Sequence, residues 1–142
     1  NPLWDYGPHA VAVALYLTGF PFPGGVHIRD AWLDQSLEGC TVDFELQLGA
    51  KTWASFSIGN NALNKARHCS VRSLDGVQHT WDGLASCTVP PLTAALAAFC
   101  SAIEAGHAPE DDIRFGWALP LEVTRVLCDI EGVLRKRCTP LA

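Results

Sequence analysis

The segment DYGPH near the start of the chain holds the two side chains best suited to moving a proton, Asp5 and His9. Residues four positions apart share one face of a helix, so both side chains could address one small polar ligand. An imidazole titrates near neutral pH and can accept a hydroxyl proton, while a carboxylate can orient the imidazole or hold a neighbouring hydroxyl. The plain structural alternative is that Asp5 caps the helix and His9 is an ordinary first-turn residue.

The element that positions this pair is a predicted helix over 5–17. Asp5 is its N-cap candidate, Pro8 falls in its first turn and Gly19 ends it. Apolar residues run all round this helix, so we expect other elements to cover it on most sides.

Strand patterns follow the helix. TVDFELQL (41–48) alternates apolar and polar residues without a fault, and KTWASFSIG (51–59) follows a Gly-Ala turn, so the two segments predict a hairpin. Residues 26–33 read as an earlier strand, and RHCSVRSL and VQHTW flank the hairpin signal Asp75-Gly76. About five strands, joined in sequence and largely antiparallel, are expected.

The remaining apolar segments have helical spacing. PLTAALAAFCSAIEAG (91–106) and PLEVTRVLCDIEGVLRKR (120–137) each predict a helix with one apolar stripe, and the polar loop HAPEDD lies between them. The expected stripes are Leu92, Leu96, Phe99 and Ile103 in the first helix, and Val123, Leu127, Ile130 and Leu134 in the second. The cluster RKR complements the dipole at the end of the second helix.

This order predicts a single α+β domain over residues 1–142, an open and largely antiparallel sheet of about five strands with helices packed on one face. The other face would carry Trp53, Ser55 and Ser57 if Ala54 and Phe56 point inward. We expect that open face to serve association into a homo-oligomer.

Composition limits the function classes. The net charge of −5 and the scattered Lys and Arg residues argue against a nucleic-acid partner. The longest apolar run, 10–17, is too short to span a membrane, and no basic segment precedes it as in a signal peptide. Methionine is absent even at position 1, so the chain is expected to be a fragment, a processed product or a trimmed sequence.

The six cysteines form no C-x-x-C pair, which argues against a zinc site and favours reduced, buried thiols in a cytoplasmic setting. Neither G-x-G-x-x-G nor G-x-x-x-x-G-K-[ST] occurs, so the chain alone is expected to bind no nucleotide cofactor. The histidines at 27, 68, 79 and 107 read as strand or helix-end residues, and no metal site is predicted.

The string LWDYGPHAVAVALYLTG resembles the start of the first long helix in the C-terminal domain of the Gfo/Idh/MocA oxidoreductases, in which a D-x-G-x-H segment continues into an apolar helix. The segment from PLTAALAAF to DIEGVL is similar to that family's closing pattern, which ends in a helix packed back on the first. The resemblance covers nearly the whole chain.

The resemblance implies the substrate-binding and oligomerisation half of an NAD(P)-dependent enzyme that acts on a sugar, polyol or similar hydroxylated compound. It implies that Asp5 and His9 are catalytic and that His9 is the proton-transfer group. NAD or NADP and an E-K-P lysine would come from a Rossmann domain, which this chain lacks. Two alternatives stay open, a cofactor-free lyase, isomerase or cyclase that reuses the pocket, and a non-catalytic binding or assembly domain.

Overall fold

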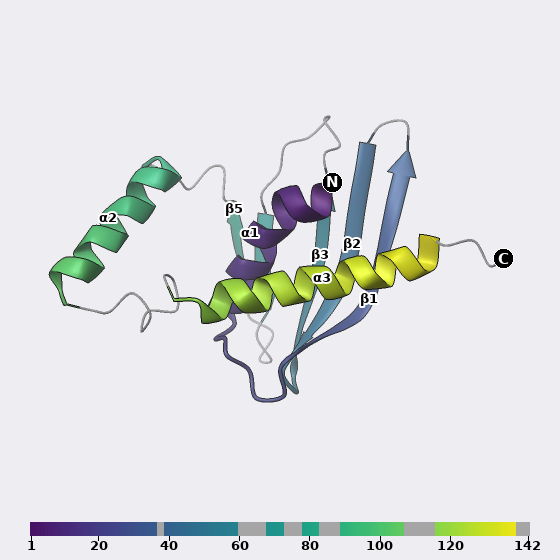
Figure 1. Ribbon diagram of the computed structural model, residues 1–142, viewed down its shortest axis with the longest axis horizontal. Helices are drawn as coiled ribbons and strands as arrows, with labels where there is room; N and C mark the ends of the chain where they lie inside the picture. Colours follow the sequence, from purple (N-terminus) through teal and green to yellow (C-terminus); the bar gives the residue numbers. More distant parts are fainter. Residues whose placement is uncertain (37–38, 60–67, 73–77, 83–88, 107–115, 139–142) are drawn as a thin grey trace. The chain divides into compact units, whose positions relative to one another are not determined.

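A computed structural model of the chain describes residues 1–36, 39–59, 68–72, 78–82, 89–106 and 116–138, which fall into two compact units (Figure 1). Unit 1 comprises Asn1–Ala62 with Glu110–Ala142, and unit 2 comprises Leu63–Pro109. The elements in chain order are α1 (Pro2–Leu17), β1 (Val26–Ser36), β2 (Gly39–Leu48), β3 (Thr52–Gly59), β4 (His68–Arg72), β5 (Gln78–Asp82), α2 (Pro91–Glu104) and α3 (Ala118–Cys138).

Unit 1 is built on an antiparallel three-stranded sheet with the order β1-β2-β3. The alternation predicted for 41–48 is confirmed, because every second residue of β2 from Val42 to Leu48 is buried. Phe44 stacks on the directly opposite Phe56 of β3, with 4.5 Å between the ring centroids. The pairing of β1 with β2 shifts between Ile28 and Asp30, and Arg29 lies at this irregularity.

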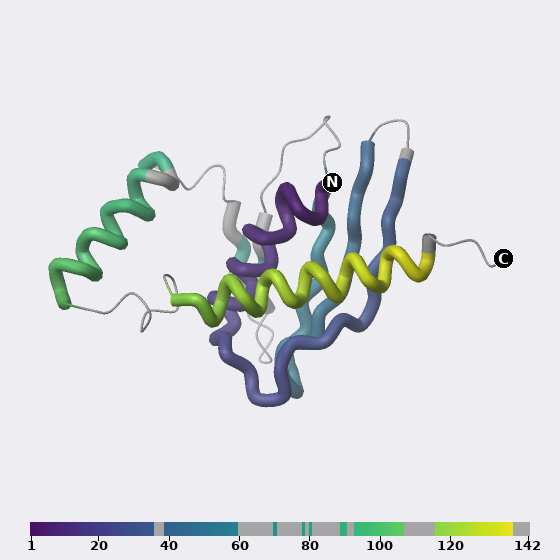
Figure 2. Tube along the Cα trace, viewed as in Figure 1, coloured from purple at the N-terminus to yellow at the C-terminus, as the bar shows by residue number. Residues whose placement is uncertain are grey.

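The helices α1 and α3 pack against one another and against the same face of this sheet, as the chain trace shows (Figure 2). We call this face the inner face. Its core joins the buried residues of the sheet to those of both helices. The stripe predicted for α3 is confirmed, since Val123, Leu127, Ile130 and Leu134 are all buried. The basic cluster lies in the last turn of α3, as expected.

Unit 2 contains a second antiparallel pair, β4 with β5. The expected turn Asp75-Gly76 lies outside the described residues. The five predicted strands are therefore present, but they form sheets of three and two strands rather than one. The helix α2 ends before Gly106, whose φ of 72° suits glycine. Leu96, Phe99 and Ile103 of its predicted apolar stripe are exposed.

The polar loop HAPEDD also lies outside the described residues, and the prediction of one domain over 1–142 stays a prediction. None of the helices in the described part of the chain is long and apolar enough to cross a membrane.

Candidate functional site

The first turn of α1 corrects one sequence prediction. The helix begins at Pro2, and its N-cap is Asn1, whose side-chain oxygen accepts a hydrogen bond from the Leu3 N–H at 3.1 Å. Asp5 is therefore not the cap, and Pro8 lies inside the helix rather than in its first turn. The physical reason is that Asn followed by Pro is itself a strong start signal, since Asn caps well and Pro fits the first helical position.

Asp5 and His9 both lie on the exposed side of α1. The Asp5 carboxylate accepts a hydrogen bond from the N-terminal ammonium of Asn1 at 3.2 Å, in a well-exposed ion pair. His9 forms no hydrogen bond or ion pair with the rest of the described chain, and it is not paired with Asp5. The structure thus places the two predicted residues on one face, without a direct link between them.

Gly7, between these two residues, faces the opposite way. It is buried, and a Cβ built there would lie 2.8 Å from the Leu127 Cδ2 atom of α3 and 3.5 Å from the Ile58 Cδ1 atom of β3. At 100° per residue, a position two steps away from both Asp5 and His9 is on the far side of the helix. The motif therefore separates into a packing residue and two displayed polar residues.

Apolar side chains surround the displayed pair. Tyr6, Val13 and Tyr16 are each nearly half exposed on α1. We expected other elements to cover α1 on most sides. Among the described residues, that expectation is wrong for the side that carries Tyr6, Val13 and Tyr16. The cause is that the inner sheet face and α3 contact only the side that carries Leu3, Gly7, Val11 and Leu15.

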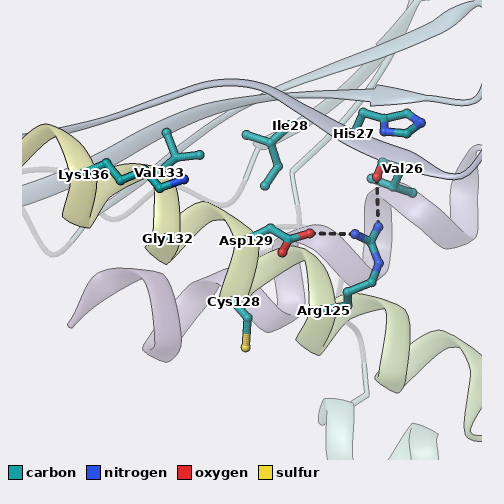
Figure 3. A pocket seen from close by; sticks show the side chains of 9 residues that line it. All are labelled: Val26, His27, Ile28, Arg125, Cys128, Asp129, Gly132, Val133 and Lys136. Carbon is teal, nitrogen blue, oxygen red and sulfur yellow. Dashed lines mark hydrogen bonds and ion pairs between the residues drawn. The ribbon is translucent and has the colours of Figure 1, made fainter.

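A polar groove of about 360 Å³ lies between β1 and α3 (Figure 3). Arg125 is its central charged group. Its guanidinium donates to both carboxylate oxygens of Glu122, at 2.6 and 2.9 Å, and to the Asp129 carboxylate at 2.6 Å. It also donates to the Val26 carbonyl of β1 at 2.9 Å, which ties the helix to the start of the sheet.

The charges around Arg125 hold one another in their ionised forms. The hydrogen bond from Arg125 lowers the pKa of the Glu122 carboxyl against a smaller opposing effect of burial, and attraction to Arg125 lowers it further. The same hydrogen bond raises the pKa of Arg125, and the nearby Asp129 adds to the rise. Because the guanidinium is shared by two carboxylates and a carbonyl, the geometry favours a structural clamp over a ligand-binding cation.

A second hollow, about 340 Å³ and largely apolar, lies between the N-terminus of α1 and the C-terminal half of α3. The residues that line it include the apolar Leu33, Val42 and Leu134 and the charged Glu131 and Arg135. Asp5 and His9 line neither hollow.

We call the sheet face opposite the helices the outer face. It carries the polar residues of each strand's alternating apolar and polar pattern. Its residues include His27, Arg29, Trp32 and Asp34 of β1, Thr41, Asp43, Glu45 and Gln47 of β2, and Trp53, Ser55 and Ser57 of β3. Asp30, the register partner of Glu45, forms an ion pair with Arg137 of α3. The predicted outward direction of Trp53, Ser55 and Ser57 is confirmed by their exposure. Trp53 is 54% exposed and Trp32 is 41% exposed.

Arg29 is the residue of the outer face that the sequence prediction missed. Its guanidinium carbon lies 4.6 Å from the ring centroid of Trp53, although Arg29 is on β1 and Trp53 is on β3. The side chain therefore reaches across β2 and places a positive charge on the outer face. Its position depends on the irregularity in β1, which sequence periodicity alone does not reveal.

The cysteines differ in part from prediction. Cys100 and Cys128 carry free thiols, but both are exposed rather than buried, and Cys40 is half-buried. No cluster of His, Cys, Asp and Glu suited to a metal ion occurs within the described residues.

Comparison with protein-family models finds no matching model. Comparisons with curated proteins and with solved structures find no match either.

Proposed function

We propose that this chain is the substrate-binding and assembly half of an NAD(P)-dependent oxidoreductase similar to the Gfo/Idh/MocA enzymes, acting on a sugar, polyol or similar hydroxylated compound. The order of elements supports this proposal. A first helix carries the D-x-G-x-H segment, antiparallel strands follow, and the last helix packs back on the first. The resemblance in the sequence implies the same order.

The observation that carries the proposal is that the residues of DYGPH have two different roles, packing against the core and exposure to a ligand. Gly7 allows α1 to approach Leu127 of α3 closely, while Asp5 and His9 are displayed on the other side of the helix. A glycine required for packing and two polar groups held outward on the same short segment favour a motif that presents Asp5 and His9 to a ligand. The apolar side chains beside them favour cover by a further domain.

In the proposed reaction, His9 accepts the hydroxyl proton of the substrate and Asp5 orients His9 or holds a second hydroxyl. NAD(P), held by a nucleotide-binding domain, would supply the hydride acceptor for the carbon that bears this hydroxyl, which becomes a carbonyl. The sequence has no G-x-G-x-x-G motif to hold a pyrophosphate, so the cofactor is expected to be held by another domain. The contribution of this chain's own residues is limited to substrate orientation and proton transfer.

The outer face of the sheet is the proposed assembly surface. Both helices of unit 1 pack on the inner face, and the outer face presents Trp32 and Trp53 to solvent. Tryptophan is enriched at protein interfaces, because it contributes a large contact area at little conformational cost. We assign this surface to a second copy of the chain, since interfaces between like subunits are usually symmetric.

A non-catalytic assembly domain is the second candidate. It is favoured by the fact that Asp5 and His9 line neither hollow. The distinguishing experiment is to express the complete open reading frame that encodes this chain and to follow NAD(P)H formation at 340 nm with a panel of sugars and polyols. Turnover of one compound class supports the oxidoreductase. A complete product that oligomerises but neither binds NAD(P) nor turns over any compound supports the second candidate.

A further inference from the structure

We infer that the polar groove between β1 and α3 binds the carboxyl end of an extended peptide, which pairs with the backbone of Ile28 and places its carboxylate beside Lys136. The site is separate from the proposed proton transfer and from the outer face. The inference follows from the backbone groups of β1 that face the groove and from the charges along α3.

The backbone of β1 has one side without a neighbouring strand among the described residues, because β1 is at the edge of its sheet. On the β2 side, the Gly25 carbonyl accepts a hydrogen bond from the Gly49 N–H at 2.9 Å. On the opposite side, the Val26 carbonyl accepts one from Arg125 at 2.9 Å. Backbone groups of successive strand residues point to alternate sides, so the N–H and C=O of Ile28 point to the same side as those of Val26. Both groups therefore face the groove, which Ile28 lines.

The edge of β1 is already occupied on either side of Ile28. The hydrogen bond from α3 takes the Val26 carbonyl. Beyond the irregularity in β1, the Asp30 carboxylate accepts a hydrogen bond from the Ala31 N–H at 2.9 Å and forms an ion pair with Arg137. A long added strand would need these groups for its own hydrogen bonds. The edge at Ile28 thus suits a short ligand that offers one acceptor and one donor.

The two ends of the groove differ in charge. Arg125 lies at one end and Lys136 at the other, with Ile28 between them (Figure 3). Arg125 is shared by the Glu122 and Asp129 carboxylates, so that end has an excess of negative charge. The Lys136 ammonium forms no ion pair within the described part of the chain. An anionic group is therefore favoured at the Lys136 end and disfavoured at the other.

The size of the groove suits two or three extended residues. The helical residues from Arg125 to Lys136 span roughly 16 Å. An extended chain rises about 3.3 Å per residue, and the groove has a volume of about 360 Å³. Gly132 keeps this side of α3 open, since a Cβ there would meet no atom within 4 Å.

A peptide that runs parallel to β1 satisfies the free groups together. The Ile28 N–H donates to one peptide carbonyl, and the Ile28 carbonyl accepts from the peptide N–H two residues further along. β1 runs from the Arg125 end of α3 toward the Arg137 end, so the carboxylate that ends such a peptide lies beside Lys136. In the reverse direction the carboxylate would lie beside Asp129, which repels it.

The test uses a minimal ligand, acetyl-alanyl-alanine, together with its uncharged carboxamide. Each is titrated into the ¹⁵N-labelled chain and followed by NMR. We expect a saturable shift of the Ile28 amide signal and slower hydrogen exchange at that amide. The acid should bind about tenfold more tightly than the carboxamide, because only the acid makes a charge-assisted hydrogen bond to Lys136.

Three variants locate the site. Lys136→Gln should reduce the affinity for the acid to that for the carboxamide. Lys51→Gln makes the same charge change at an exposed turn outside the groove and should leave both affinities unchanged. Gly132→Leu should abolish binding of both ligands, because its side chain fills the groove. Circular dichroism and thermal denaturation of each variant check that the fold is kept.

Three results would overturn the inference. The first is the absence of a saturable shift at Ile28. The second is equal affinity for the acid and the carboxamide, or a preference for the acid that survives Lys136→Gln. The third is binding of acetate alone as tightly as the dipeptide, which would indicate an adventitious ion only. The assay of NAD(P)H formation is separate, so none of these results decides the proposed function.

Discussion

Gly7 shows how much a single residue decides about α1. A side chain at this position would force Leu127 to shift, because a Cβ would lie 2.8 Å from Leu127 Cδ2. Gly132 in α3 is a useful contrast, since a Cβ there would meet no atom within 4 Å. Both glycines lie inside helices, so both cost helix stability relative to alanine.

We therefore expect opposite results from two matched substitutions. Gly132→Ala should raise the free energy of unfolding by about 0.5–1 kcal/mol, the usual gain in a helix interior. Gly7→Ala should gain nothing, because the displaced Leu127 offsets the helix propensity, and Gly7→Val should lower the free energy of unfolding by about 1–3 kcal/mol. Urea denaturation measures all three, and a Gly7→Ala gain equal to that of Gly132→Ala would contradict this account of the motif.

Asp5 gives a second prediction at the residue scale. Because Asn1 is the N-cap and the Asp5 side chain is exposed, Asp5→Asn should change the free energy of unfolding by less than about 0.5 kcal/mol. The proposed role of Asp5 in orienting His9 or the substrate predicts a loss of turnover in the same variant. A loss of stability that matches the loss of turnover would point instead to a structural role.

At the scale of elements, α3 is tied to β1 by Arg125. The bond from its guanidinium to the Val26 carbonyl joins residues 99 positions apart in the sequence. The spacing of Glu122, Arg125 and Asp129 predicts helical ion pairs, so this part of the clamp could be found from the sequence. The bond to β1 could not, because it depends on the packing of the sheet.

The clamp predicts a pH dependence of stability. The pKa of Glu122 is lower in the folded chain than its ordinary value of 4.5, so the ionised carboxylate favours folding. This contribution is complete above the unfolded pKa and is lost as the pH falls through the folded pKa. Glu122→Gln should therefore lower the free energy of unfolding by about 0.5–1 kcal/mol at pH 7, the usual size for a partly exposed pair.

The same variant should differ little from the wild type at a pH below the folded pKa of Glu122, where the wild-type carboxyl is also neutral. Urea denaturation at both pH values gives the comparison. A difference between variant and wild type that is the same at both would show that the ion pair contributes nothing to folding.

Much of the fold could be predicted from the sequence, since periodicity identifies each strand and the long helices. Val42 and Phe44 alternate with polar residues, and Val123 and Leu127 repeat at helical spacing. The pairing of strands into two sheets could not be predicted, because a period of two does not say which strands are neighbours. Asn1-Pro2 indicates the true start of α1. Asp5 is also a residue type that caps helices, so it predicted a later start.

The candidate site is harder to predict than the fold. The sequence places Asp5 and His9 on one helix face, but it does not show that this face points away from the core. Periodicity does not predict the position of the Arg29 side chain, because the irregularity in β1 is defined only by its register with β2.

At the scale of the whole molecule, association through the outer face predicts that the chain elutes as a dimer or a larger species. A charge placed at an exposed interface tryptophan should weaken association without loss of the fold, because the side chain contacts solvent in the free subunit. Trp53→Glu and Trp32→Glu test this by size-exclusion chromatography with light scattering, and Thr124→Glu, at an exposed position of α3 away from the outer face, is the control. A monomeric wild type would contradict the assembly role.

The account also predicts that the isolated chain binds neither NAD(H) nor NADP(H), because its sequence has no G-x-G-x-x-G motif to hold a pyrophosphate. Isothermal titration calorimetry with each dinucleotide measures this. Saturable binding would show that the cofactor is held by this chain, in conflict with the proposed division between two domains.

The central claim is that His9 transfers the substrate proton, and the most direct measurement is the turnover of His9→Asn in the complete enzyme, followed as NAD(P)H formation. Asn keeps a polar side chain of moderate size at an exposed helical position, so we expect an unchanged thermal midpoint. Turnover should fall about a hundredfold to ten-thousandfold. Wild-type turnover in His9→Asn would contradict the claim.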